Sequence, residues 1–159
     1  FVQDTIVRGN TVRNAGRGAN GNAHEANILA GAISVHAAGP KNTIAAGMQN
    51  QRITIENNTI ENTGGIGLVI VAAKDVTVRG NTIRNVAIDG PVKAGLAFGI
   101  DTTAAIYVNE AEGVVFENNS VDIGTGSAKT IFAKGDNATV VNAEAGIKPV
   151  TAGNVSAAK

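Results

Sequence analysis

Three residues of this chain that could carry out acid–base chemistry lie together in residues 86–103, which contain Asp89, Lys93 and Asp101. The two carboxylates could form the pair that hydrolysis of a glycosidic bond requires. Lys93, or His36 elsewhere in the chain, could instead be the base of an elimination or epimerisation, near a cation that neutralises charge. We therefore predict Asp89, Lys93 and Asp101 as candidate catalytic residues.

A second group of residues combines an aromatic ring with polar side chains that are suited to binding sugars. The ring belongs to Tyr107, and the polar members are His36, Asn109 and Lys134. A saccharide site needs an apolar surface for C–H groups, together with amides and charges for hydroxyls and carboxylates. These four residues are the predicted substrate-binding residues. The competing interpretation is that they are ordinary residues of an exposed strand face and that the loop carboxylates are solvated.

Composition and charge exclude several other kinds of function. The chain has 159 residues, and its 13 basic and 13 acidic residues give no net charge. This balance provides no electrostatic reason to bind nucleic acid or an anionic membrane. The absence of cysteine excludes a disulfide scaffold, a thiolate nucleophile and a cysteine-based zinc site. Adjacent His24 and Glu25 are weak evidence for a metal, so we predict no metal site and no cofactor.

The aliphatic residues favour strands over helices. Isoleucine and valine together number 34, whereas leucine numbers 3. Residues branched at Cβ favour extended backbone. Asparagine, with 18 residues, tolerates the left-handed conformation that sharp bends between strands require. The composition therefore indicates an all-β protein with many tight corners.

An internal repeat defines the organisation of these strands. Four segments align without gaps, at residues 5–14, 53–62, 76–85 and 114–123, and a weaker fifth copy covers residues 131–141. The shortest complete copy spans about 23 residues, which is too short to bury its apolar face alone. Stacked copies would form a continuous core. The repeat therefore predicts a parallel β-helix of about five coils, with right-handed turns expected from the usual handedness of parallel crossovers.

Aligning the copies sorts their residues into columns. Three inward columns are predicted: Val7, Ile55, Val78 and Phe116; Val12, Ile60, Ile83 and Val121; and Ile33, Leu68, Ile106 and Ile131. An asparagine column contains Asn10, Asn58, Asn81 and Asn119, whose amides could hydrogen-bond from coil to coil. Two outward columns alternate in charge: Arg8, Glu56, Arg79 and Glu117; and Arg13, Glu61, Arg84 and Asp122. A slip of one coil would bring like charges together, so these charges are predicted to fix the register.

Function on a solenoid usually lies on its insertions and on one exposed face. Residues 1–142 are predicted to form the coils, with insertions at residues 15–31, 37–51 and 86–103, and residues 143–159 to form a terminal cover or linker. The first and third insertions leave the same corner and could wall a groove. Val69 and Val71 would form its floor, and Tyr107 a wall on which a sugar ring stacks.

The segments ITIENNTIEN, VTVRGNTIRN and VVFENNSV resemble the right-handed parallel β-helix superfamily, also called pectate-lyase-like. The resemblance implies a polysaccharide or oligosaccharide ligand and a secreted or periplasmic location. The Asn-Thr-Asp, Gly-His-Gly and Asp-Pro-His motifs of its enzymes are absent, and no aspartate cluster suggests a calcium site.

We therefore expect the C-terminal portion of an extracellular carbohydrate-active β-helix protein, of the glycoside hydrolase or polysaccharide lyase type. The alternative is a non-catalytic structural or adhesive β-helix. Upstream coils, or end-to-end packing with another chain, would cover the N-terminal coil.

Overall fold

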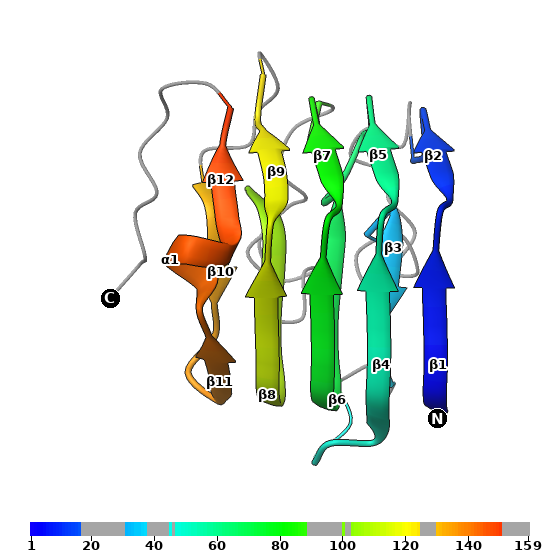
Figure 1. Cartoon of the computed structure of the whole chain (residues 1–159), viewed down its shortest axis with the longest axis vertical. Helices are drawn as coiled ribbons and strands as arrows, with labels where there is room; N and C mark the ends of the chain where they lie inside the picture. The colour runs from blue at the N-terminus through cyan, green and yellow to red at the C-terminus, as the bar shows by residue number, and fades with distance from the viewer. Residues whose placement is uncertain are drawn as a thin grey trace.

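The computed structural model describes residues 1–16, 31–37, 45, 47–88, 100, 103–124 and 130–150, and its regular secondary structure is almost entirely parallel strands (Figure 1). The strands lie side by side along one axis, from β1 and β2 at one end to β12 at the other. The elements are β1 (Gln3–Arg8), β2 (Thr11–Arg13), β3 (Ile33–Val35), β4 (Asn50–Glu56), β5 (Thr59–Glu61), β6 (Leu68–Arg79), β7 (Thr82–Arg84), β8 (Ala104–Glu117), β9 (Asn119–Asp122), β10 (Thr130–Lys134), β11 (Ala138–Val141), α1 (Ala143–Gly146) and β12 (Ile147–Pro149).

These strands form five stacked coils with three faces, which confirms the predicted parallel β-helix. The first face contains β3, β10 and the early parts of β6 and β8; the second contains β1, β4, β11 and the later parts of β6 and β8. The third face contains β2, β5, β7, β9 and β12 in one sheet. The first two faces belong to one bent sheet, because β6 and β8 turn at Ala72 and Glu110, where φ is 52° and 45°.

The core runs along the axis between the three faces. The register pairs Ile55 with Val78 and Val78 with Phe116, as the alignment predicts. It also pairs Ile60 with Ile83 and Ile83 with Val121. All of these side chains are buried, whereas Val7 and Val12 in the first coil are only partly buried. The alternation of apolar and polar residues therefore produces the inward columns.

Left-handed residues stack at the corners and explain why glycine alternates with asparagine there. Asn57 and Asn118 have φ values of 53° and 52°, and Gly9 and Gly80, at the same corner in the first and third coils, have φ values of 66° and 61°. A Cβ atom at Gly80 would lie 2.5 Å from Asn57 Oδ1. Glycine at this position therefore leaves room for the asparagine side chain of the preceding coil.

The predicted asparagine column is a continuous hydrogen-bonded ladder. The backbone nitrogen and Nδ2 of Asn58 both donate to Asn81 Oδ1, at 3.0 and 2.9 Å, and those of Asn81 donate to Asn119 Oδ1 at 3.1 and 2.9 Å. Asn10 donates to Asn58 Oδ1 in the same way. Asn81 Nδ2 also donates to Ile55 O of the preceding coil, at 2.9 Å. Each interior amide therefore bridges three coils, and the ladder has a direction.

The charged columns form ion pairs that centre on the second coil. Glu56 binds both Arg8 and Arg79, the latter with Nε 2.5 Å from Glu56 Oε2. Glu61 is held in the same way between Arg13 and Arg84. The arginines cover both glutamates. These residues are therefore buried, although an outward position in the coil predicts exposure to solvent. Hydrogen bonds from the arginines lower the pKa of each glutamate below its ordinary value.

The coils extend beyond residue 142, where the sequence prediction ends them. Strand β12 adds to the third face and pairs Ile147 with Asn119. Helix α1 comes just before it and packs closely on β8. The two backbones are so close that a Cβ atom added at Gly146 would collide with Phe116 O. The ladder ends here, where Asn119 Nδ2 donates to Gly146 O at 3.2 Å. In the described part of the chain, no helix has the length and hydropathy needed to cross a membrane.

Candidate functional site

The three predicted catalytic residues, Asp89, Lys93 and Asp101, lie outside the residues that the structure describes. Most of the three predicted insertions also lies outside them. Strand β4 begins at Asn50, so the last two residues of the predicted insertion 37–51 belong to the second coil rather than to a loop.

Two of the predicted binding residues point to the outer side of the first face, and a third follows a strand of that face. Tyr107 pairs with Val69, and Asn109 pairs with Val71 of the preceding coil. His36 follows β3 directly and is exposed. The alignment therefore places Tyr107 and Asn109 at their predicted positions in the coils.

The outer side of this face is not the open groove that the sequence analysis expects. Tyr107 is only 3% exposed, and Val69 and Val71 are fully buried. They belong to a second apolar cluster, separate from the axial core, whose members are Ile66, Val69, Val71, Ile100, Ala104, Tyr107 and Ala133. The expected floor and stacking wall are thus covered, and a sugar ring cannot stack on Tyr107 in this structure.

A feature of the sequence accounts for this burial. Residues 68–73 read LVIVAA and residues 104–108 read AAIYV, so apolar residues occupy both sides of these strands. A strand with one solvated side alternates, whereas a continuous apolar run is typical of a strand that is buried on both sides. The signal was present in the sequence and predicts a second layer over the first face.

Asn109 has an unusual environment at the margin of this second cluster. Its Oδ1 is buried and receives no hydrogen bond in the described part of the chain. The carboxamide lies against Gly135, where an added Cβ atom would collide with it. Buried acceptors without a partner are uncommon in folded proteins. Asn109 is therefore packed into the coil stack, with one acceptor unsatisfied.

Lys134 lies on the opposite side of its strand from the predicted one. Strand β10 pairs Phe132 with Ile106 and Lys134 with Val108, so both face the axis, whereas the alignment placed Ile131 beside Ile106. The shift brings the ring of Phe132 against that of Phe116, with ring centroids 5.5 Å apart and an interplanar angle of 73°. The small side chain of Ala133 then stacks outside, on Tyr107. Filling the core with the larger side chain provides the physical reason for the shift.

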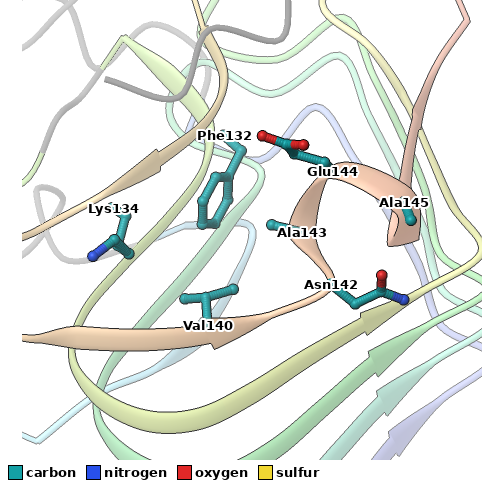
Figure 2. Close-up of a pocket in the computed structure, with 7 residues that line it drawn as sticks. All are labelled: Phe132, Lys134, Val140, Asn142, Ala143, Glu144 and Ala145. Carbon is teal, nitrogen blue, oxygen red and sulfur yellow. The ribbon is translucent and has the colours of Figure 1, made fainter. Parts of the chain in front are cut away.

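Phe132 and Lys134 line a pocket at the C-terminal end of the axial core, which we call the end pocket (Figure 2). Its volume is about 410 Å³. The residues that line it come from β10, β11 and the segment around α1: Phe132, Lys134, Val140, Asn142, Ala143, Glu144 and Ala145. Among the described residues, β10, β11 and β12 are the last strands of the stack, and α1 lies at the same end (Figure 1).

The end pocket combines an apolar wall with polar groups at its margin. Figure 2 shows the Phe132 ring and Val140 on one side, Ala143 facing them, and the Lys134 amine and Glu144 carboxylate at separate points around them. Lys134 Nζ donates one hydrogen bond to Ala138 O, at 3.1 Å. Glu144 is exposed. The arrangement can hold a ring-shaped ligand by apolar contact and bind its polar substituents with one cation and one anion.

A second pocket of about 440 Å³ lies at the corner between the first and second faces. It contains Glu110, Glu112 and Asp136, but Asn137 Nδ2 donates to Glu110 at 2.6 Å and Lys74 pairs with Glu112 at 3.5 Å. Among the residues that the structure describes, no three acidic or histidine side chains are placed to hold a metal ion. Glu110 and Glu112 therefore have local partners, and the end pocket is the stronger candidate site.

Comparison with known proteins agrees with this architecture. Neither the curated proteins nor the solved structures that were compared with the chain gave a match. A family model described as the right-handed β-helix region matches residues 2–145. The matched range contains the repeat, the asparagine ladder and every residue that lines the end pocket, and it ends before β12. The chain therefore belongs to the right-handed β-helix family.

Proposed function

We propose that this β-helix binds an acidic polysaccharide, as part of an extracellular or periplasmic carbohydrate-active protein, and that the end pocket holds a sugar residue of that ligand. One observation carries the proposal: the Lys134 ammonium stands at the margin of a pocket walled by Phe132 and Val140. The choice of ligand is motivated by the resemblance of the repeat segments to the pectate-lyase-like superfamily, which implies a polysaccharide or oligosaccharide ligand.

The size and lining of the end pocket suit a saccharide unit. Pockets that bind small ligands have volumes of roughly 300–1,000 Å³ and are largely apolar, with a few polar groups that set orientation. The apolar C–H face of a sugar ring would pack on Phe132, and Glu144 would accept hydrogen bonds from hydroxyl groups. Lys134 has two N–H donors left after its bond to Ala138 O. A uronate carboxylate would use them in a charge-assisted hydrogen bond.

Binding is tested by titrating the 159-residue chain with oligogalacturonate and with a neutral oligosaccharide of the same length, using calorimetry. Lys134→Met keeps most of the aliphatic side chain and removes the charge, so it should weaken binding of the acidic ligand by about 10–100-fold. Lys148→Met is the matched control, because Lys148 is an exposed lysine on β12 that does not line the pocket. The proposal is wrong if the acidic ligand does not bind, or if both variants bind it equally well.

Cleavage is tested separately by analysing products. Hydrolysis by the predicted carboxylate pair would create reducing ends that disappear in Asp89→Asn and Asp101→Asn. Elimination with Lys93 as the base would create unsaturated products that disappear in Lys93→Met. Binding without products would identify the chain as a binding module.

A non-catalytic structural β-helix is the second candidate, and a specific observation favours it. The predicted sugar-stacking face is buried in an apolar cluster. The two buried glutamates, Glu56 and Glu61, each form ion pairs with two arginines. A structural role predicts that no oligosaccharide changes the melting temperature. A ligand-dependent increase in that temperature would exclude it.

A further inference from the structure

The outer side of the second face forms an exposed surface along the side of the solenoid, which we call the flank surface. In Figure 1 its strands, β1, β4 and the later parts of β6 and β8, lie side by side, and no labelled element crosses in front of them. The surface is built from the sides of the coils, so it does not depend on what adjoins either end of the stack. From the first coil to the fourth, its three columns are Asp4, Arg52, Asp75 and Gly113; Ile6, Thr54, Thr77 and Val115; and Arg8, Glu56, Arg79 and Glu117.

The middle column of the flank surface consists of residues branched at Cβ that reach solvent. Ile6 is 59% exposed, and Thr54, Thr77 and Val115 are partly exposed. Two sheets pack face to face through rows of such side chains. The middle column therefore offers an apolar contact, and the charged columns on either side of it decide what can lie against it.

Two carboxylates of the flank surface lack an ionic partner. Asp75 and Glu117 are exposed, and no cation among the described residues lies within ion-pair distance of either. Their neighbours in the preceding coils, Arg52 and Arg79, bind Asp4 and Glu56 instead. The side chains of Arg8 and Arg52 are 60% and 48% exposed, so each can accept a second anion.

We propose that the flank surface binds the flank surface of a second copy of this chain, with the two solenoid axes antiparallel. A two-fold axis along the strand direction, between the second and third coils, places each column over the same column of the partner in reverse order. Asp75 then lies opposite the partner's Arg52, and Glu117 lies opposite the partner's Arg8. In the middle column, Ile6 lies opposite the partner's Val115.

The charges select this arrangement over the other ways in which two flank surfaces can meet. A shift by one coil places Arg52 opposite the partner's Arg52 in one direction, and Arg79 opposite the partner's Arg79 in the other. Like charges in such contacts disfavour a complex. A two-fold axis along the solenoid brings equivalent coils together, and it leaves Glu117 opposite the partner's Gly113. Of these arrangements, the antiparallel one gives both unpaired carboxylates an arginine.

The size of the flank surface predicts a weak dimer. Four coils about 4.8 Å apart and six residues of about 3.3 Å each outline about 400 Å². Stable complexes bury about 800 Å² on each partner. We therefore expect a dissociation constant of about 10 μM to 1 mM at low salt, and weaker association at high salt.

Exchange of charge between two positions tests the contact by sedimentation equilibrium of the 159-residue chain. Arg52→Asp and Asp75→Arg should each weaken self-association about tenfold or more, because each places like charges opposite one another twice. An equimolar mixture of the two variants should associate again, since each then faces its complement. Residues 52 and 75 share a left-handed backbone, with φ values of 54° and 55°, and Asp75→Arg breaks no ion pair within the chain. Lys148→Asp, an equal change of charge on exposed β12, is the matched control and should leave association unchanged.

A crosslinking experiment tests the antiparallel order and uses the absence of cysteine from the chain. A short thiol-to-thiol crosslinker should join Ile6→Cys to Val115→Cys in a mixture of the two variants. It should not join either variant to itself, because equivalent residues would lie three coils apart, about 14 Å along the axis. A monomeric chain at low salt, charge variants that associate as well as the unaltered chain, a mixture that does not recover, or self-crosslinking of either cysteine variant would each overturn the proposal.

Discussion

Replacing Asn81 with alanine removes the most connected amide of the ladder. The side chain is buried, accepts from the backbone N–H and Nδ2 of Asn58, and donates to Ile55 O and Asn119 Oδ1. Asn119 Oδ1 keeps its bond from the backbone of residue 81, and Asn58 Nδ2 keeps its bond to Val7 O. The backbone N–H of Asn58 loses its acceptor, and Ile55 O loses the amide donor.

Each buried polar group without a partner costs about 1–3 kcal/mol, and water that enters the site recovers part of this free energy. For two groups we expect a loss of about 2–4 kcal/mol in the free energy of unfolding. In a chain of this size the loss lowers the melting temperature by about 4–16 °C. Thermal and urea unfolding, followed by circular dichroism at the strand signal, measure both quantities.

Asn10→Ala is the matched control, because it removes the same side chain from the exposed end of the ladder. Asn58 Oδ1 still accepts from the backbone of residue 10 at 2.9 Å, so no buried group loses its only partner. We expect a loss below about 1 kcal/mol. If Asn81→Ala is as mild as Asn10→Ala, the buried amides of the ladder do not stabilise the stack.

Three further changes test the core and the charges. Ile83→Ala opens a cavity at a fully buried position and should cost about 2–5 kcal/mol in urea unfolding, whereas exposed Thr82→Ala beside it should be near neutral. Arg79→Glu places a carboxylate between those of Glu56 and Glu117, so the melting temperature should fall at low salt and partly recover at high salt. A loss that does not depend on salt would contradict an electrostatic cause. Hydrogen bonds from the arginines lower the pKa of Glu56 and Glu61. The contribution of these two carboxylates to folding stability is therefore present above the ordinary pKa of 4.5, and it is lost as the pH falls through the lower pKa of the folded state. Glu56→Gln with Glu61→Gln should flatten the dependence of melting temperature on pH in that range.

The repeat made the stack predictable because the same short pattern of residues recurs in each coil, so equivalent positions can be aligned into columns. Ile55, Val78 and Phe116 occupy the same place in gapless copies, so alternation alone assigns them to the core. The same alignment identifies the asparagine ladder and the alternating charges. The burial of the Glu56 side chain was not predictable in this way, because it comes from two long arginine side chains that reach over it from neighbouring coils.

The candidate site was less predictable, because it depends on places where the repeat fails. The fifth coil lacks the ENN or RGN motif, so nothing local fixed whether Ile131 or Phe132 lies beside Ile106. Packing against Phe116 decides this, and with it the side of the strand on which Lys134 lies. The prediction of an open outer face was wrong for a different reason. Alternation distinguishes inward from outward residues, but it does not say whether the outward residues contact water or a second apolar layer. At Tyr107 they contact a second apolar layer.

The two kinds of column carry different information about how coils stack. The ladder has asparagine in four successive coils, so it favours stacking without distinguishing one coil from the next. The charges repeat with a period of two coils, and the corner residues follow them, since the coils of Arg8 and Arg79 carry glycine where those of Glu56 and Glu117 carry asparagine. Within the chain, the order of the coils along the sequence removes the remaining ambiguity.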